Sequence, residues 1–271
     1  MTLHVYNDLV QGSEEWLAAR RGIVTASVVG QLVSTSRPSG LGYDCPECGA
    51  AAGEPCVSRA RRDAAPIKTL HATRVAPSDA PLVVEASTND TSRALTTLLV
   101  AERITGWTDP VYVSDDMMRG TLDEPIARDL YSRHYAPVTE VGFMVRDDWG
   151  YPIGYSPDGL VGDDGLIEVK SRRAKKQLAT ILADEVPIEN VAQCQAGLLV
   201  SGREWLDYVS LCGGMPLYVK RVHPDPEWFA AITSAVALFE SHAAAMASHY
   251  RDAVRGLPPT ERIEHFAGIE F

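Results

Sequence analysis

The chain has 271 residues, of which 45% are hydrophobic and 23% are charged, as in a globular protein rather than a disordered one. No apolar run approaches the roughly 20 residues of a membrane span, and the N-terminus lacks the features of a secretory signal. The net charge of −11 argues against a surface coated with phosphate contacts, although carboxylates can hold divalent cations. We therefore expect a cytoplasmic protein without membrane association, in which any nucleic-acid groove is local.

The first predicted elements are two helical pieces within residues 13–35. Ser13 is a suitable N-cap for the first piece, since two glutamates follow it and Gly22 lies beyond the helix end. Thr25 is a suitable N-cap for the second piece, which begins with an Ala-Ser-Val-Val run. The N-terminal segment is therefore predicted to be helical before the composition changes.

That change marks a candidate domain boundary. A stretch containing Ser, Pro and Gly leads into a group of cysteines, and a stretch rich in Pro and Ala leads out through Pro81. We interpret residues 37–80 as an insertion with a small structure of its own. The main domain then consists of residues 1–36 and 81–271.

Three of the five cysteines and one histidine form a metal-binding pattern within the insertion. An odd number of cysteines, three of them within twelve residues, does not resemble a secreted disulfide framework. The spacing Cys-x₂-Cys-x₇-Cys-x₁₄-His, made by Cys45, Cys48, Cys56 and His71, fits one tetrahedral zinc ion. Because protein ligands fill all four positions, we expect the zinc to be structural. The alternative is three unpaired thiols; the segment resembles small Cys₃His modules of actinobacterial phage proteins.

Basic residues gather in and after this segment. The zinc module could hold a loop, or it could present the arginines of the insertion to DNA: Arg59, Arg61, Arg62 and Arg74. A second basic run follows Lys170. Within that run we predict that Arg172 and Arg173 contact the DNA backbone.

Downstream of the insertion, helices alternate with short strands. Apolar periodicity predicts helices over 91–106, 115–135, 188–201 and 226–250. Short apolar runs predict strands over 138–146, 152–156, 166–171, 205–212 and 217–222. This pattern indicates an α/β (α+β) fold, with a central mixed sheet flanked by helices.

Two carboxylates and a lysine lie on a predicted hairpin at 156–170. Side chains alternate across a strand, so Glu168 and Lys170 share one face. Asp158, near the end of the partner strand, can converge on the same point. Glu124, in the first turn of a helix, is the best candidate for a third carboxylate.

This set suits phosphodiester hydrolysis. Carboxylates can hold Mg²⁺ or Mn²⁺, which lowers the pKa of a bound water, and a lysine can stabilise charge that builds on the phosphate. The alternative is a surface hairpin carrying an ordinary Glu–Lys pair. The nearest rival carboxylates are Asp123, Asp163 and Asp164, of which the last two are predicted to be turn residues.

An acid on a helix followed by Asp, a gap of about ten residues and Glu-x-Lys resembles the PD-(D/E)XK nuclease pattern, whose fold is restriction-endonuclease-like. More narrowly, the chain resembles the phage lambda exonuclease and YqaJ-like viral recombinase family. The matching segments are Trp…Arg-x-Gly-x-x-Thr-Ala-Ser within 14–27, the Gly…Glu helix around Glu124, and the Gln-x-Gln helix at 191–202. They occur in the order that the family has.

The resemblance implies a role for each matched residue. Glu124, Asp158 and Glu168 would hold the divalent metal, and Lys170 would assist the attacking water. Arg20 and Ser27 would receive a 5′-terminal phosphate, and an Arg fork beside a hydroxyl suits that task. Gln193 and Gln195 do not share a helix face, so one of them would look into the site. We favour Gln195, as a fifth catalytic residue.

The resemblance also implies an exonuclease that digests the 5′-ended strand of linear duplex DNA and leaves 3′ single strands. A phage single-strand annealing protein would be its partner, and a homo-oligomeric ring follows by analogy. The insertion departs from the plain family pattern and puts DNA entry and the ring in doubt. Two alternatives are a structure-specific nuclease similar to those of CRISPR adaptation, and an inactive zinc-finger DNA-binding protein.

Overall fold

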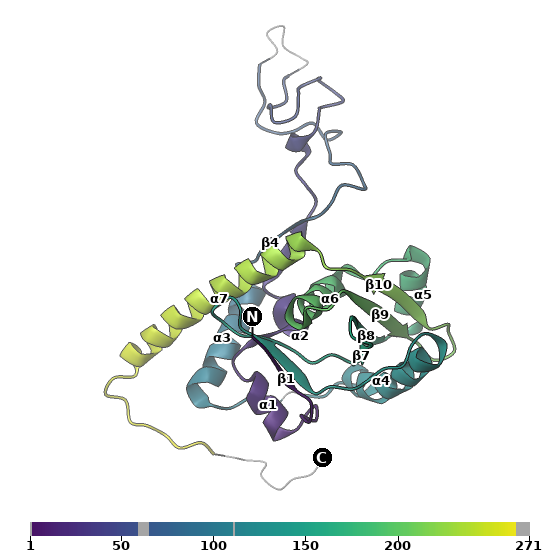
Figure 1. Ribbon diagram of the computed structural model, residues 1–271. Coiled ribbons are helices and arrows are strands. Elements are labelled where there is room, and N and C mark those ends of the chain that lie inside the picture. The colour runs from purple at the N-terminus through teal and green to yellow at the C-terminus, as the bar shows by residue number, and fades with distance from the viewer. Residues whose placement is uncertain (1, 59–64, 111, 264–271) are drawn as a thin grey trace.

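The computed structural model describes residues 2–58, 65–110 and 112–263 (Figure 1). The elements, in chain order, are β1 (Leu3–Tyr6), α1 (Glu14–Arg20), β2 (Val24–Thr25), α2 (Ala26–Val29), β3 (Val33–Ser36), η1 (Gly40–Gly42), β4 (Val83–Ala86), α3 (Asp90–Thr105), α4 (Asp115–His134), β5 (Phe143–Arg146), β6 (Ile153–Tyr155), β7 (Gly159–Val161), β8 (Gly165–Ser171), α5 (Ala174–Ala183), α6 (Ile188–Ser201), β9 (Trp205–Leu211), β10 (Tyr218–Val222) and α7 (Pro226–Ala253).

Two four-stranded sheets and one two-stranded sheet organise the described residues. The first sheet has the order β1-β5-β6-β2, and its β2–β6 pair is parallel. The second has the order β10-β9-β8-β7, and its β8–β9 pair is parallel while the outer pairs are antiparallel. The predicted α/β (α+β) class is confirmed, and the mixed sheet is divided into two.

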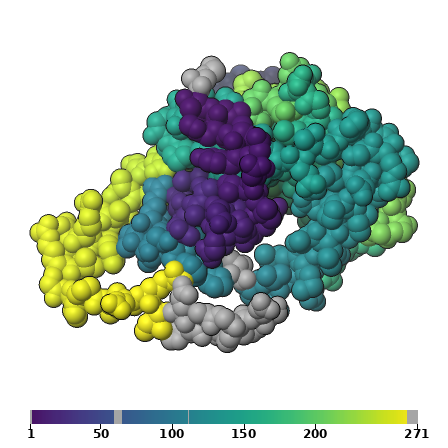
Figure 2. Space-filling model, turned by 60° about the horizontal axis from the view of Figure 1, so that its bottom comes forward, coloured from purple at the N-terminus to yellow at the C-terminus, as the bar shows by residue number. Residues whose placement is uncertain are grey.

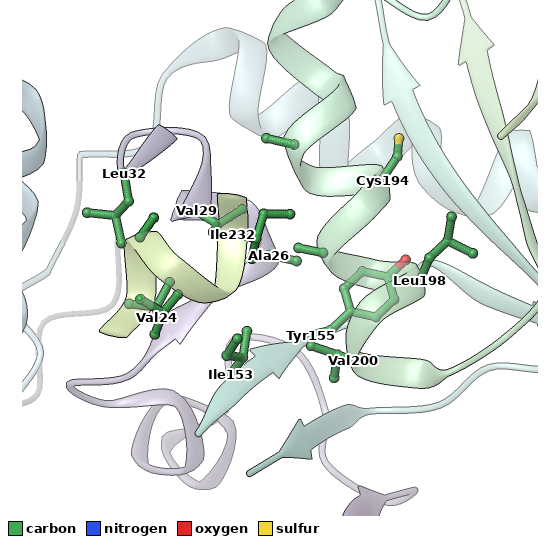
Figure 3. Close-up of a cluster of buried hydrophobic side chains, with 14 of the residues drawn as sticks. Val24, Ala26, Val29, Leu32, Ile153, Tyr155, Cys194, Leu198, Val200 and Ile232 are labelled. Carbon is green, nitrogen blue, oxygen red and sulfur yellow. The ribbon is translucent and has the colours of Figure 1, made fainter. Parts of the chain in front are cut away.

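The larger core joins the first sheet to helices α6 and α7. Ile153 and Tyr155 of β6 are buried against Leu198 of α6 and Ile232 of α7 (Figure 3). Burying a side chain of this size contributes roughly 1.5–3 kcal/mol. This core therefore fixes β6, which leads directly into the predicted site at residues 156–158.

A second core lies between α4 and the β7-β8-β9 face. Ala127 and Tyr131, four residues apart on α4, pack with Ile167 and Val169 of β8 and with Val209 of β9. Because β8 alternates, Ile167 and Val169 point to this core and leave Glu168 and Lys170 on the opposite face. The packing of α4 thus sets the position of Glu124 relative to β8.

Helix α5 was not predicted, because polar side chains face its buried side and leucines face solvent. Gln177 is fully buried and donates to the carbonyl groups of Ser210 and Pro216, whereas Leu178 and Leu182 are exposed. Apolar periodicity cannot reveal a helix whose inner face is polar.

The second N-terminal helical piece is shorter than predicted. Helix α2 spans four residues, and Val33–Ser36 instead forms β3. The partner of β3 is β4, with Val33 opposite Ala86 and Ser36 opposite Val83. Since this partner lies beyond the insertion, local sequence gives no sign of the pairing.

The chain between β3 and β4 projects away from the rest of the molecule (Figure 1). At its base the β3–β4 ladder brings the two ends of the excursion together. Helix α7 packs against β4 at this base and runs across the body beside α3 and α6.

Helix α7 is the one helix within the described residues long and apolar enough to cross a membrane. Its apolar side chains are also used in packing: Trp228, Ile232, Val236 and Phe239 recur along one buried face. Figure 2 shows the N-terminal segment in purple lying between the yellow end of α7 and the teal segments of the middle of the chain.

Candidate active site and zinc site

The β7–β8 hairpin brings Asp158, Glu168 and Lys170 together, as the alternation predicts. Lys170 Nζ lies 2.7 Å from Glu168 Oε1, although only 1% of the Glu168 side chain is exposed. Asp158 directly precedes β7, and its Oδ2 accepts a 2.6 Å hydrogen bond from the Val169 backbone N–H. That bond turns the Asp158 carboxylate toward β8.

Glu124 reaches the same cavity from α4. Its Oε1 accepts from Arg128, one helical turn later, and Arg128 Nε donates to the Asp158 carbonyl oxygen at 2.9 Å. Arg128 also pairs with the exposed Glu140 at 2.8 Å. This arginine therefore ties the helix carboxylate to the main chain that carries Asp158.

Both oxygens of the Glu168 carboxylate accept further hydrogen bonds, one from a tyrosine and one from a glutamine. Tyr155 Oη donates to Glu168 Oε2 at 3.2 Å, and Gln193 Nε2 donates to Glu168 Oε1. Gln195 faces elsewhere: its Nε2 donates to the His223 carbonyl, and its Oε1 accepts from the Asp225 N–H. The expectation that Gln195 enters the site is wrong in this structure, because these two bonds hold its amide against the start of α7.

Electrostatics in the cavity favour a cation. Burial, then Glu168 and Glu124, raise the pKa of Asp158 well above its usual value. Burial also raises the pKa of Glu124, against the opposing effect of Arg128. Burial would lower the pKa of Lys170, but Glu168 and Asp158 outweigh it and raise that pKa, so Lys170 is cationic. Converging carboxylate oxygens at this density of negative charge fit Mg²⁺ or Mn²⁺.

Arg20 and Ser27 lie on the wall of the same cavity, which has a volume of about 470 Å³. Arg20 Nη2 donates to the hydroxyl groups of Thr25 and Ser27 at 3.3 and 3.2 Å, and its guanidinium stacks 4.0 Å from the Trp16 ring centroid. Trp16 is held in turn by a 3.0 Å bond from Nε1 to the Ser156 hydroxyl. The arginine is thus a pre-oriented fork at the edge of the carboxylate cluster.

The structure places the rival carboxylates in other roles, and it gives the two arginines of the basic run different environments. Asp123 accepts a 2.6 Å bond from Ser171, and Asp163 and Asp164 lie in the β7–β8 turn, as predicted. Arg172 is turned inward, donating to Asn190 and to Tyr208 Oη at 2.9 Å, so its predicted contact with the DNA backbone is not supported. Arg173 is exposed.

The predicted zinc ligands converge in the insertion. One ligand atom from each of Cys45, Cys48, Cys56 and His71 lies within 4.8 Å of all the others, which suits a single tetrahedral ion. His71 Nδ1 lies 3.4 Å from Cys45 Sγ, while its Nε2 lies 3.6 Å from Glu47 Oε1. Nδ1 therefore faces the cysteines and would be the ligand atom, and Glu47 would orient the ring as carboxylates do behind metal-binding histidines.

Two further features of this segment suit a metal. The Val57 backbone N–H, opposed by burial, is the main cause that lowers the pKa of Cys48 to about 6, so its thiolate forms readily. Arg74 is 2% exposed and donates to five backbone carbonyls and to Cys56 Sγ. Arg74 therefore holds the loops and is not presented to DNA. Arg59, Arg61 and Arg62 lie outside the described residues.

Sequence reasoning missed three residues that orient the cluster, Trp16, Arg128 and Tyr155, and it favoured Gln195 over Gln193. For Gln193 a signal existed in Gly197, four residues later on the same helix face. A Cβ at Gly197 would lie 2.8 Å from the Tyr155 ring, so the glycine marks the face of α6 that lies on β6. That face, and not the face of Gln195, looks into the cavity.

Comparisons with known proteins agree with this architecture. The profile of the YqaJ-like viral recombinase domain matches residues 68–204, slightly more than half of the chain. A second profile, the "Putative DNA-binding phage zinc finger domain", matches residues 11–88. The comparison with curated proteins gave no match.

Two solved structures of one protein resemble this chain along nearly its whole length. They are an alkaline exonuclease, LHK-Exo, from Laribacter hongkongensis, and the same protein in complex with dAMP. Each is 25% identical, with a TM-score of 0.65, and the match covers 91% of this chain and 100% of the other. From the extent of its profile match, this chain belongs to the YqaJ-like viral recombinase family.

Proposed function

We propose that this protein is a divalent-metal-dependent DNA exonuclease of phage-type recombination. The observation that carries the proposal is the convergence of Glu124, Asp158, Glu168 and Lys170 on one cavity. The likeness to an alkaline exonuclease at 25% identity supports the same reaction class. The substrate would be linear double-stranded DNA, and the reaction hydrolysis of its phosphodiester bonds.

Each residue has a definite task in this proposal. Glu124, Asp158 and Glu168 would hold Mg²⁺ or Mn²⁺, which when bound supplies Lewis acidity and a water of lowered pKa. Lys170, cationic and 2.7 Å from Glu168, orients the attacking water and offsets negative charge building on the phosphate. Gln193 and Tyr155 donate to Glu168 and fix its two oxygens. Gln193 takes the position that Gln195 was expected to hold.

Arg20 and Ser27 would receive the 5′-terminal phosphate. Burial lowers the pKa of Arg20, yet a guanidinium remains charged at any physiological pH. The fork already holds two hydroxyl groups and lies against Trp16, so a phosphate meets a pre-oriented donor set. This arrangement favours digestion from 5′ ends, which leaves 3′ single strands.

The zinc-binding insertion, residues 37–80, would fold as a unit separate from the domain of residues 1–36 and 81–271. Its four ligands lie within one excursion that the β3–β4 ladder closes. Zinc there would be structural, and the match to a phage zinc-finger profile described as DNA-binding supports a role in DNA contact. The annealing protein, the homo-oligomer and the cytoplasmic location remain parts of this proposal that follow from the family.

Digestion of end-labelled duplex DNA tests the proposal. Linear duplex carries a label at either the 5′ or the 3′ end, and covalently closed circular duplex serves as the substrate without ends, both with Mg²⁺ present. We expect linear duplex to lose the 5′ label first, as mononucleotides, and closed circles to survive. Cutting of circles would indicate an endonuclease, and early release of the 3′ label would reverse the direction.

A further inference from the structure

A groove of about 580 Å³ adjoins the catalytic cavity and is strongly basic. Five of its eight lining residues are Arg or Lys, and a single one, Asp116, is acidic. This is unusual in a chain whose net charge is −11. Local positive charge on an acidic protein marks a place where polyanions are bound rather than repelled.

Two arginines in this groove converge on one carboxylate oxygen. Asp116 Oδ1 accepts from Arg119 Nη1 at 2.8 Å and from Arg173 Nη2 and Nε at 2.8 and 3.0 Å. Arg173 and then Arg119 lower the pKa of Asp116, so it stays charged. The two guanidinium groups thus already present a fork to an anionic oxygen, which is the geometry that phosphate accepts.

The two arginines of this pair differ in how firmly the protein holds them. Arg119 Nε donates to Ser171 Oγ at 2.9 Å, and Ser171 donates to Asp123 at 2.6 Å. Arg173 stands at the start of α5 and has 69% of its side chain exposed. One arginine is therefore anchored between α4 and β8, while the other is free to adjust to a ligand.

The groove opens directly onto the catalytic cavity. Both are lined by Asp116 and Ser171, and Ser171 follows Lys170 in β8. Arg20, Thr25 and Ser27 line the cavity but not the groove. A strand lying in the groove would thus pass the arginine pair, cross the carboxylates and end at Arg20.

We propose that Arg119 and Arg173 form a clamp for one backbone phosphate of the DNA strand being cut, on the side of the scissile bond away from the 5′ end. Asp116 occupies this position until the phosphate replaces it. The clamp rests on the proposed exonuclease function, which defines the strand and its 5′ end. It would hold the remaining strand in register after each nucleotide is released.

Salt dependence of DNA binding tests the clamp without requiring catalysis. Binding of a short 5′-phosphorylated duplex is measured over a salt series in a Glu168→Gln background, which prevents cutting. In Arg119→Gln/Arg173→Gln, the slope of log affinity against log salt should fall by about 0.9, the value for one lost phosphate contact. The matched control, Arg133→Gln, removes an exposed charge farther along α4 and should keep the parent slope.

Neutral methylphosphonate linkages then locate the phosphate. One linkage at a time is replaced, first in the 5′-ended strand and then in its complement. In the parent, we expect one replacement near the 5′ end of the cut strand to weaken binding, and the double variant to be indifferent to it. An unchanged slope in the double variant, or sensitivity confined to the complement, overturns the clamp.

These outcomes are distinct from failure of the exonuclease proposal. If wild type never degrades linear duplex with Mg²⁺, the proposed function fails, whatever the salt slope shows. If wild type degrades DNA but the double variant binds with the parent slope and the parent methylphosphonate pattern, the clamp alone is wrong. Circular dichroism of the double variant should match the parent, because Arg173 is exposed and Arg119 is only half-buried.

Discussion

The proposed catalytic cavity and the cluster of three cysteines and one histidine would each hold a metal ion, but the two sites draw their residues from the chain in opposite ways. The zinc ligands fall between residues 45 and 71 and lie in one projecting excursion. The residues of the cavity range from Gln11 to Gln193 and come from loops and from α1, β2, α2, α4, β6, β8 and α6. The zinc site depends on the spacing of residues close together in the sequence. The cavity depends on the packing of helices and strands that are far apart in the sequence.

This difference predicts how each region should respond to damage. Loss of zinc should unfold the excursion but leave the sheets and their cores in place, since the excursion joins the body through the β3–β4 ladder and the contacts of α7. Damage at the cavity should instead remove activity while leaving zinc bound.

The largest expected effect is loss of zinc in Cys48→Ser. Removing one of four ligands should reduce bound zinc from about one ion per chain to none after dialysis, because thiolate ligation supplies most of the binding free energy. The body should still melt near the wild-type temperature. Elemental analysis and calorimetry measure both quantities, with Cys212→Ser as the control. Retention of full zinc would remove Cys48 from the site.

Arg20→Ala should erase the preference for a 5′-phosphate. Charged hydrogen bonds of this kind contribute about 1.5–3 kcal/mol, or roughly a tenfold to hundredfold preference. Rates on duplexes with 5′-phosphate and 5′-hydroxyl ends are compared in both proteins, with Arg21→Ala as the neighbouring control. An equal preference in wild type and Arg20→Ala would remove Arg20 from this role.

Glu47→Gln should weaken zinc binding without abolishing it. Its carboxylate orients His71 from behind, and loss of such a partner costs roughly 10- to 100-fold in metal affinity. Competition with a chromophoric chelator measures the change. Wild-type affinity in this variant would mean that the Glu47–His71 contact has no influence on the ion.

Substitutions of the two glutamines of α6 should affect different quantities, one the rate of DNA hydrolysis and the other the free energy of unfolding. Gln193→Ala should slow DNA hydrolysis with little change in unfolding free energy, because the variant loses a donor to Glu168. Gln195→Ala should cost about 1–3 kcal/mol of stability, since it removes two part-buried hydrogen bonds, one to the His223 carbonyl and one from the Asp225 N–H, each contributing about 0.5–1.5 kcal/mol. Chemical denaturation and rate measurements should show opposite profiles. The reverse pattern would restore Gln195 to the site.

Local patterns were enough to predict that the three cysteines and His71 converge, and that Asp158, Glu168 and Lys170 come together on the hairpin. A Cys-x₂-Cys spacing carries its own geometry, and strand alternation places Glu168 and Lys170 on one face. Predictions failed where a distant partner decides the structure. Strand β3 pairs across the insertion, and the inner face of α5 is polar.

The roles of neighbouring polar residues could not be read from their types. Arg172 and Arg173 are adjacent and chemically identical, yet one is turned inward to Tyr208 and the other is exposed. Gln193 and Gln195 differ only in the helix face that they occupy. Such choices depend on the packing of α6 and β9, which sequence spacing alone does not fix.

The most direct test of the central claim is degradation of linear duplex DNA by Lys170→Ala with saturating Mg²⁺. Lys170 Nζ donates to Glu168 Oε1 at 2.7 Å and would supply positive charge beside the reacting phosphate, so its loss should slow hydrolysis by roughly a hundredfold or more. Lys220→Ala, which removes an exposed lysine paired with Asp184, should cut at the wild-type rate. If Lys170→Ala also cuts at that rate, the assigned cavity is not the active site.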